Sequence, residues 1–125
     1  MKNLVPLTVV LMLAPAPVAA QNLTEAHGFW MRDDGNARVE IAPCGGDICV
    51  TNVWIGDTSG GEQVGDSLVL SLTPKSANTF AGSAYDGKRK RTYSMTLRIA
   101  ERGLATRGCI LGGVVCRTVN WTPAE

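Results

Sequence analysis

Apolar and polar residues alternate with a period of two along most of the chain, and this pattern restricts the fold more than any other feature. In residues 92–100, hydroxyl-bearing or charged residues separate four apolar positions, Tyr93, Met95, Leu97 and Ile99. Alternation of this kind gives a β-strand one apolar and one polar face, whereas an amphipathic helix repeats every 3.6 residues. We therefore predict an all-β fold.

Eight segments with this pattern are separated by Gly, Asp, Asn or Pro, the residues that favour turns. They span 28–32, 37–42, 48–55, 67–73, 78–85, 92–100, 103–109 and 114–121. The stretch 56–66 contains four glycines and is predicted to be an open loop. Short strands joined mostly by hairpins, without a long crossover, predict an eight-stranded antiparallel up-and-down barrel, with an open sandwich as the alternative. A short helix around 23–27 could cap one end.

The first twenty residues lack the alternating pattern. Lys2 precedes a largely apolar run, and Val18-Ala19-Ala20 supplies the small residues that signal peptidase requires. The run is interrupted by prolines and is shorter than the roughly 20 residues of a transmembrane helix. We predict a periplasmic or secreted protein with a signal peptide over 1–20, a flexible mature N-terminus over 21–27, a barrel domain over 28–122 and a tail over 123–125.

Charge is balanced in the predicted mature chain. The sequence has 12 basic and 11 acidic residues, and loss of Lys2 with the signal peptide leaves 11 of each. A neutral domain has no general attraction for polyanions, so we expect no nucleic-acid partner, and no later segment is apolar enough for an integral membrane helix. The run Lys88-Arg89-Lys90-Arg91 is a local exception, which indicates a solvated hairpin tip or, alternatively, a site for an anionic ligand.

All four cysteines lie outside the predicted signal peptide, at Cys44, Cys49, Cys109 and Cys116. An oxidising compartment would allow two disulfides, for which three pairings are possible. Local pairing is favoured because each neighbouring pair brackets a predicted turn, centred on Gly46-Asp47 or on Gly112-Gly113. The first pair would occupy the closer, non-hydrogen-bonded cross-strand position and the second the wider one. The spacings C-x4-C and C-x6-C match neither zinc ribbons nor redox motifs, so we expect no metal site.

Several motifs along the chain form a recognisable set: Gly28-Phe29-Trp30, Ile41-Ala42-Pro43-Cys44-Gly45, and Arg107-Gly108-Cys109 followed by Cys116-Arg117-Thr118. Together they resemble the DUF2147 family of exported bacterial proteins. The resemblance implies a lipocalin-like barrel, in agreement with the strand count. It also implies that Arg117 packs over the indole of Trp30 and closes one end of the barrel. The chain departs from the family at Phe80, where members usually have Trp, and in an expanded turn over 86–93.

If the barrel encloses a cavity, its walls are the apolar strand faces. We expect five residues to contribute to a site for a small apolar or amphiphilic ligand, namely Trp54, Leu70, Tyr93, Met95 and Leu97. Plain core packing of the same side chains is the alternative, because a short eight-stranded barrel can be filled by its own side chains.

Two functions fit this fold by analogy. One is a module that binds a small apolar or amphiphilic molecule, and the other is a protein-interaction module such as a periplasmic protease inhibitor, which would use 21–26 or 56–66 as its probe. We expect no enzymatic activity and no cofactor. The single histidine, His27, has no partner at a spacing typical of catalysis, and Asp33-Asp34 before Gly35-Asn36 is typical of a turn.

We predict export with cleavage after Ala20, because the small residues before this bond fit signal peptidase. Intact-mass spectrometry of protein recovered from the periplasm or the medium should show a chain that starts at Gln21. A recovered chain that retains Met1 to Ala20 would contradict the prediction.

Overall fold

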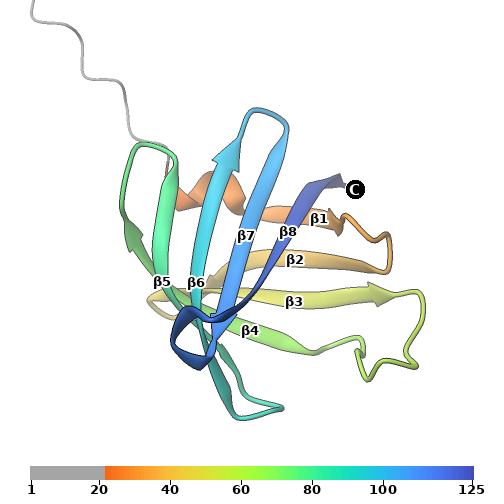
Figure 1. Ribbon diagram of the computed structural model, residues 1–125. Helices are drawn as coiled ribbons and strands as arrows, with labels where there is room; N and C mark the ends of the chain where they lie inside the picture. Colours follow the sequence, from red (N-terminus) through yellow and green to blue (C-terminus); the bar gives the residue numbers. More distant parts are fainter. Residues whose placement is uncertain (1–21) are drawn as a thin grey trace, which may run out of the picture.

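The structure, a computed structural model, describes residues 22–125, so the predicted signal peptide lies outside the described residues. The described chain forms a closed antiparallel barrel in which each strand pairs with the next and the eighth pairs with the first (Figure 1). The strands are β1 (Gly28–Arg32), β2 (Ala37–Cys44), β3 (Asp47–Ile55), β4 (Ser67–Pro74), β5 (Thr79–Asp86), β6 (Arg91–Ala100), β7 (Gly103–Ile110) and β8 (Val115–Ala124). The predicted eight-stranded up-and-down barrel is confirmed.

Pairing of β1 with β8 closes the barrel. Phe29 lies opposite Ala124, and Trp30 lies opposite Pro123. β8 therefore continues beyond residue 121, where the alternating pattern ends, and includes residues that were expected to form a tail. The bounds of the other seven strands agree with the predicted segments to within two residues.

The barrel has two ends of different character. Because consecutive strands run in opposite directions, the connections 45–46, 75–78 and 101–102 lie at one end, together with the 3-10 helix η1 (Leu23–Ala26). We call this the η1 end. The connections 33–36, 56–66, 87–90 and 111–114 lie at the other end, which we call the loop end, and the last of them contains a second 3-10 helix, η2 (Leu111–Gly113).

The hydrophobic core lies mostly on the η1 side of the barrel interior. Its buried members come from η1 and from seven of the strands: Ala26, Trp30, Val39, Ile41, Ile48, Leu70, Phe80, Ala84, Leu97, Ile99 and Leu104. Most of them occupy alternate positions of their strands, as the period-two pattern requires. This half of the barrel is therefore filled by its own side chains.

The predicted helix near residue 23 exists as η1, and it packs against this core. Asn22 caps it by accepting a hydrogen bond from the backbone N–H of Thr24. Ala26 is fully buried, and its carbonyl oxygen accepts a 2.8 Å hydrogen bond from the indole Nε1 of Trp30. The largest side chain of the core thus buries its apolar ring while its single polar group keeps a partner.

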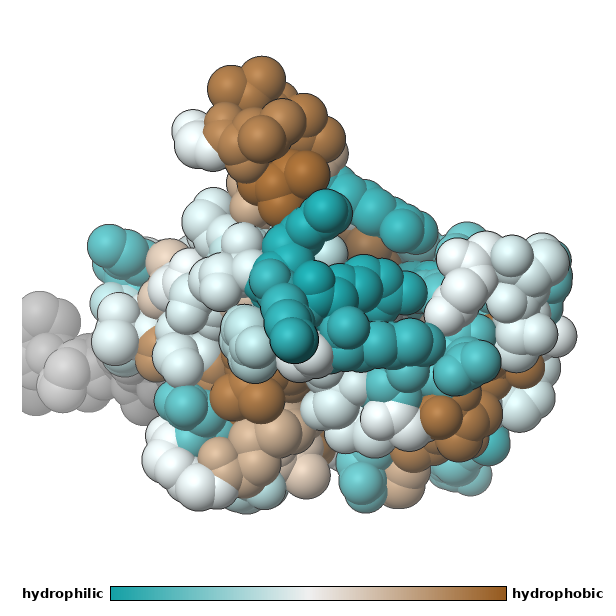
Figure 2. Space-filling view, turned by 90° about the horizontal axis from the view of Figure 1, so that it is seen from below, coloured by the Kyte–Doolittle hydropathy of each residue, from teal (hydrophilic) through white to brown (hydrophobic). Residues whose placement is uncertain are grey.

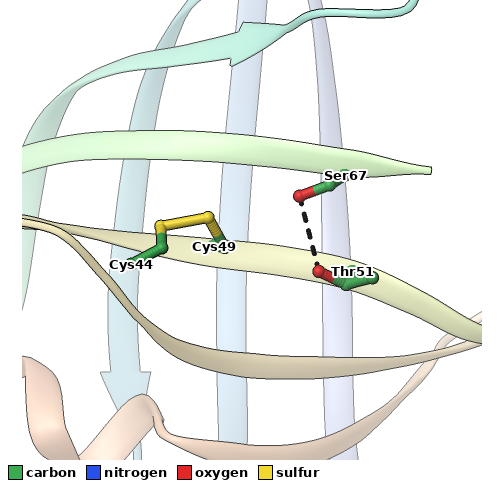
Figure 3. Close-up of a disulfide and its surroundings, with 4 residues drawn as sticks. All are labelled: Cys44, Cys49, Thr51 and Ser67. Carbon is green, nitrogen blue, oxygen red and sulfur yellow. Dashed lines mark hydrogen bonds between the residues drawn. A yellow bond between two sulfur atoms is a disulfide. The ribbon is translucent and has the colours of Figure 1, made fainter. Parts of the chain in front are cut away.

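The Cys44–Cys49 disulfide confirms the predicted pairing, but the turn between the two cysteines lies one residue earlier than expected. The two-residue turn is formed by Gly45-Gly46, where Gly45 adopts φ 64°, a conformation that glycine tolerates without strain. Cys44 therefore lies opposite Asp47 and Cys49 opposite Ala42. The disulfide is consequently a diagonal link rather than the directly opposed pair that was expected, with the two Cα atoms 5.7 Å apart (Figure 3).

The Cys109–Cys116 disulfide also confirms the predicted pairing, and here the two cysteines are directly opposite one another. The expected wider position was wrong, since their Cα atoms are only 4.1 Å apart. The reason is the length of the connection. Residues 111–114 form a four-residue turn, so the first pair of the ladder is Ile110 with Val115 instead of residues 111 and 114. Hydrogen-bonded and non-hydrogen-bonded pairs alternate along an antiparallel ladder, so starting the ladder one residue later gives Cys109 and Cys116 the closer, non-hydrogen-bonded position.

We predict that Trp30→Ala lowers the free energy of unfolding by about 3 to 5 kcal/mol, because it empties a large core site and leaves the Ala26 carbonyl without its partner. Phe29 is the matched control: it is the preceding residue of the same strand, and its side chain is 41% exposed. Phe29→Ala should cost about 1 kcal/mol or less. Urea unfolding measures both variants, and equal effects would show that the indole does not stabilise the core as described.

Candidate binding site

A cavity of about 590 Å³ occupies the loop end of the barrel. Its position follows from the inward-facing residues of the strands, which change from apolar to polar toward the loops. On β1 the inward position after Trp30 is Arg32, and on β5 the inward position after Ala84 is Asp86. Removing charged side chains from water costs free energy, so they do not pack together into a water-free core, and the interior stays hollow where they gather. The cavity therefore begins where the core ends.

The inner part of the cavity is mostly apolar. Its apolar lining residues come from four strands and are Val50, Leu68, Tyr93, Met95, Val119 and Trp121. Thr106 lies beside them, and its hydroxyl accepts a 2.9 Å hydrogen bond from the indole Nε1 of Trp121. Gly108 also lines the cavity, and a Cβ there would lie 3.2 Å from Cε of Met95, so glycine leaves room for this side chain. A ligand in this part would contact apolar surface.

Arg32 organises the outer part of the cavity. Its guanidinium binds Glu62 through both terminal nitrogens and Asp34 through Nε at 2.9 Å, while its side chain is only 10% exposed. The hydrogen bond to Glu62 is the largest cause that raises the pKa of Arg32. The same bonds lower the pKa values of Glu62 and Asp34 below their ordinary range. These three groups therefore stay charged at neutral pH.

Asn36 ties the long loop 56–66 to the connection between β1 and β2. Its side-chain amide donates to the carbonyl of Asp57 at 3.0 Å and to Glu62 at 3.3 Å, and its side-chain oxygen accepts from the backbone N–H of Asp57 at 2.7 Å. The sequence predicted an open loop because of its glycines. In the structure, side-chain contacts hold this loop against the side of the cavity.

The hairpin between β5 and β6 holds the opposite end of the same loop. Nζ of Lys88 contacts both carboxylate oxygens of Asp66 at 3.2 Å and the carbonyl of Gly61 at 3.3 Å. Loop 56–66 is thus attached at Glu62 to β1 and at Asp66 to the β5–β6 hairpin. These attachments fix the outline of the loop end.

Asp86 is the one charged side chain that is buried among residues 22–125, with 5% of its surface exposed. It accepts hydrogen bonds from the backbone N–H groups of Lys88 and Arg89 and from Nη1 of Arg89 at 3.0 Å. Burial alone would raise its pKa, but the bonds from Arg89 and Lys88 outweigh burial, so the pKa of Asp86 is lowered. The cavity wall therefore contains a carboxylate whose burial is offset by its hydrogen bonds and its ion pair with Arg89.

Arg117 lies at the cavity and not beside Trp30. The register puts Pro123 opposite Trp30, and Arg117 is six positions earlier on β8, about 20 Å along the strand. Its guanidinium lies 3.8 Å from Asp34, and 68% of its side chain is exposed. The expected stacking of Arg117 over Trp30 is thus not found, because the two residues belong to opposite ends of the barrel.

Of the five residues expected to form a ligand site, the structure places two in the cavity. Tyr93 and Met95 line it, whereas Leu70 and Leu97 are buried in the core with 2% and 0% of their surfaces exposed. The core alternative weighed for these leucines thus describes them correctly. They occupy inward positions, but on the part of the strands where the barrel is filled.

Trp54 lies on the outside of the barrel and is 42% exposed. The cause is an irregularity in the β2–β3 ladder: Val39 pairs with Asn52, but Arg38 pairs with Trp54, so Val53 is an extra residue. Such a bulge reverses the direction of the residues that follow it. Strict alternation from Ile48 would have pointed Trp54 inward, and the bulge leaves no clear signal in the sequence.

Three residues of the cavity were not predicted from the sequence as site residues: Arg32, Glu62 and Trp121. Arg32 could have been predicted, because it lies two residues after Trp30 at the end of the same strand, and alternation therefore points both side chains into the barrel. Trp121 similarly alternates with polar residues on β8. Glu62 lies on an irregular loop, where no periodicity indicates a direction. Asp34, assigned to a turn, does accept the turn hydrogen bond from the Asn36 backbone, but it also binds Arg32.

No group of three or more His, Cys, Asp or Glu side chains in residues 22–125 is arranged to hold a metal ion. Within these residues, no helix has the length and apolar character needed to cross a membrane.

The fold and the cavity define the class of protein: a lipocalin-like, eight-stranded up-and-down barrel, filled at one end and hollow at the other. The chain belongs to the family described as "Uncharacterized protein conserved in bacteria (DUF2147)", whose sequence profile matches residues 28–123. No curated protein and no solved structure matches the chain. The matched region begins with β1 and ends one residue before the end of β8, so it covers nearly the whole barrel.

We predict that Glu62→Gln lowers the free energy of unfolding by about 1 to 2 kcal/mol at neutral pH, because a charge-assisted bidentate pair with Arg32 is lost. The pKa of Glu62 is lowered in the folded state, so this stabilisation exists above the ordinary pKa of a glutamate and is lost as the pH falls through the folded value. The difference between variant and wild type in urea unfolding should therefore shrink toward about pH 3.

Glu101→Gln is the control, since Glu101 is an exposed carboxylate in the turn at the η1 end. It should change stability by less than about 0.5 kcal/mol at either pH. A difference for Glu62→Gln that is the same at both pH values would show that the ion pair with Arg32 is not the cause.

Proposed function

We propose that this protein is an exported binding module that holds a small amphiphilic molecule in the cavity of its barrel and catalyses no reaction. One observation supports this most strongly: the same cavity, which is open to solvent at the loop end, has an apolar inner part and a charged outer part. An amphiphile has the same division. Its apolar portion would lie against Leu68, Met95 and Trp121, and its polar group would lie near Arg117 and Asp34.

The volume of the cavity fits this proposal. About 590 Å³ lies within the range of typical small-molecule sites, which is about 300 to 1,000 Å³. Each 100 Å² of apolar ligand surface removed from water contributes roughly 2.5 kcal/mol before the costs of association. A ligand with a medium or long hydrocarbon portion can thus bind at micromolar concentration.

Balanced charges in the outer part favour a polar or zwitterionic head group over a simple anion. Four cationic side chains face four carboxylates there: Arg32, Lys88, Arg89 and Arg117 on one side, and Asp34, Glu62, Asp66 and Asp86 on the other. Arg117 has the longest of these contacts and the most exposed side chain, so it is the cation most available to a ligand. It is the residue that we expect to contact the head group.

Export is part of the proposal. Two disulfides support it, because such bonds persist in oxidising compartments and are rare in the cytosol. The apolar N-terminal run of the sequence supports it as well. The alternative, a protease inhibitor, would need an accessible probe segment. Of the two candidates, residues 23–26 form η1 against the core, and loop 56–66 is attached at Glu62 and Asp66, so no observation favours the inhibitor over the cavity.

Binding of a fluorescent lysophosphatidylcholine, a single-chain amphiphile with a zwitterionic head group, tests the proposal. We predict that Met95→Trp, which fills the inner part of the cavity, weakens binding at least about tenfold. Thr96→Trp is the matched control, because Thr96 is the next residue of β6 and its side chain is exposed. It should leave the affinity unchanged. Equal affinity of wild type and Met95→Trp would exclude the cavity as the binding site.

Tryptophan quenching by the bound probe locates it independently. The chain has three tryptophans, and Trp121 lines the cavity whereas Trp54 is on the outer surface. Trp121→Phe should remove most of the quenching, and Trp54→Phe should retain it. The reverse result would place the probe outside the barrel.

A further inference from the structure

The loop end bears an apolar projection, formed by residues 110–115 at the tip of the β7–β8 hairpin. Leu111, Val114 and Val115 are 73%, 82% and 50% exposed, and they are three of the seven large exposed apolar side chains among the described residues. Figure 2 looks onto this end of the barrel and shows the apolar group standing out from the surface beside a broad hydrophilic area. We call these residues the tip.

The tip is rigidly built. Gly108 and Arg117 line the cavity and lie opposite one another, and the next pair of the ladder is Cys109 with Cys116, joined by a disulfide. Ile110 and Val115 form one further pair, so the tip extends about 7 Å beyond the cavity-lining pair. Ordering a flexible loop would oppose binding, and the disulfide reduces this cost in advance.

The backbone of the tip adopts an uncommon conformation. Leu111 has φ 55°, a left-handed conformation that a leucine rarely adopts. Asn or Gly would be more favourable there on conformational grounds and on grounds of hydration. Leucine is unfavourable at this position for two reasons, the left-handed backbone conformation and the exposure of an apolar side chain to water. Its presence points to a contact between this side chain and another molecule.

Cations lie near the tip on the same end of the barrel. The β5–β6 hairpin presents Lys88-Arg89-Lys90-Arg91, of which Lys88 is paired with Asp66 and Arg89 with Asp86. Lys90 and Arg91 are exposed. The carboxylates around the cavity are already paired, since Asp34 and Glu62 bind Arg32. The hairpin therefore offers positive charge that the neighbouring acids do not neutralise.

We propose that the loop end docks on an anionic lipid bilayer, with the tip inserted among the head groups and Lys90 and Arg91 against the lipid phosphates. A small apolar projection beside cations is the combination that binds membrane interfaces. A protein partner fits less well, because a stable interface buries about 1,200 Å² or more, and three side chains on a narrow tip cannot supply that area. In this orientation the cavity faces the lipid surface.

Co-sedimentation with vesicles tests the docking, with no other ligand added. Wild-type protein from the periplasm or the medium should bind vesicles of phosphatidylglycerol and phosphatidylcholine more tightly than vesicles of phosphatidylcholine alone. The double variant Leu111→Asn with Val114→Ser should lose at least about tenfold in partitioning. Both changes are at exposed positions, and Asn suits the left-handed conformation, so the fold is retained.

Val64→Ser is the control for the tip, since Val64 is a 63% exposed valine on loop 56–66, and it should bind as wild type does. Lys90→Ser with Arg91→Ser should weaken binding about tenfold or more at low salt and much less at high salt. Arg102→Ser at the η1 end is the control for charge and should have no effect.

Failure of wild-type protein to bind anionic vesicles would overturn the proposal, and so would equal binding by wild type and the double tip variant. A third contrary result is a dimer in sedimentation velocity that the double tip variant converts to a monomer, without any vesicle binding by either protein. That result would make the tip a contact with a second copy of the chain.

Discussion

Hydrogen bonding between β1 and β8 is the constraint on which the rest of the structure depends. It pairs both edge strands, so the sheet has no free edge and alternate residues of every strand must face a common interior. Once the interior is enclosed, the chemistry of each inward position decides whether it is packed or hollow. Apolar residues fill the η1 side, and η1 itself packs there through Ala26 and the indole of Trp30.

The hollow half depends on charges that are paired with one another. Arg32 binds carboxylates from two different connections, and Asp86 is buried with Arg89 as its partner. Each pair relieves the cost of keeping a charge away from water, while none of them can pack as densely as leucine or valine. The same interactions attach loop 56–66 to its neighbours. The same ion pairs thus stabilise the loop end and keep the cavity from filling with packed side chains.

Periodicity predicted the strands well, because alternation is imposed directly by the enclosed interior. It predicted less well which side chains point into the barrel, and which residues are paired, wherever the strand ladder is irregular. The extra residue Val53 turns Trp54 outward, and the turn at Gly45-Gly46 makes Asp47, instead of Cys49, the cross-strand partner of Cys44. Arg117 was assigned by resemblance to the wrong end of the barrel. Side chains on loops, such as Glu62, have no periodic signal, so the ion pairs of the cavity could not be derived from the sequence.

The short separations of the two disulfides have a consequence for the order of events in oxidative folding. Each bond joins residues only five or seven positions apart, and the two bonds lie at opposite ends of the barrel. A crossed bond between Cys44 and Cys109 would close a loop about thirteen times longer than the native Cys44–Cys49 loop, which costs about 2 kcal/mol more in chain entropy. The native partner is therefore favoured at every stage. Cys49 follows Cys44 so closely that the first bond can form before the later strands have folded, without any disulfide isomerase having to correct it.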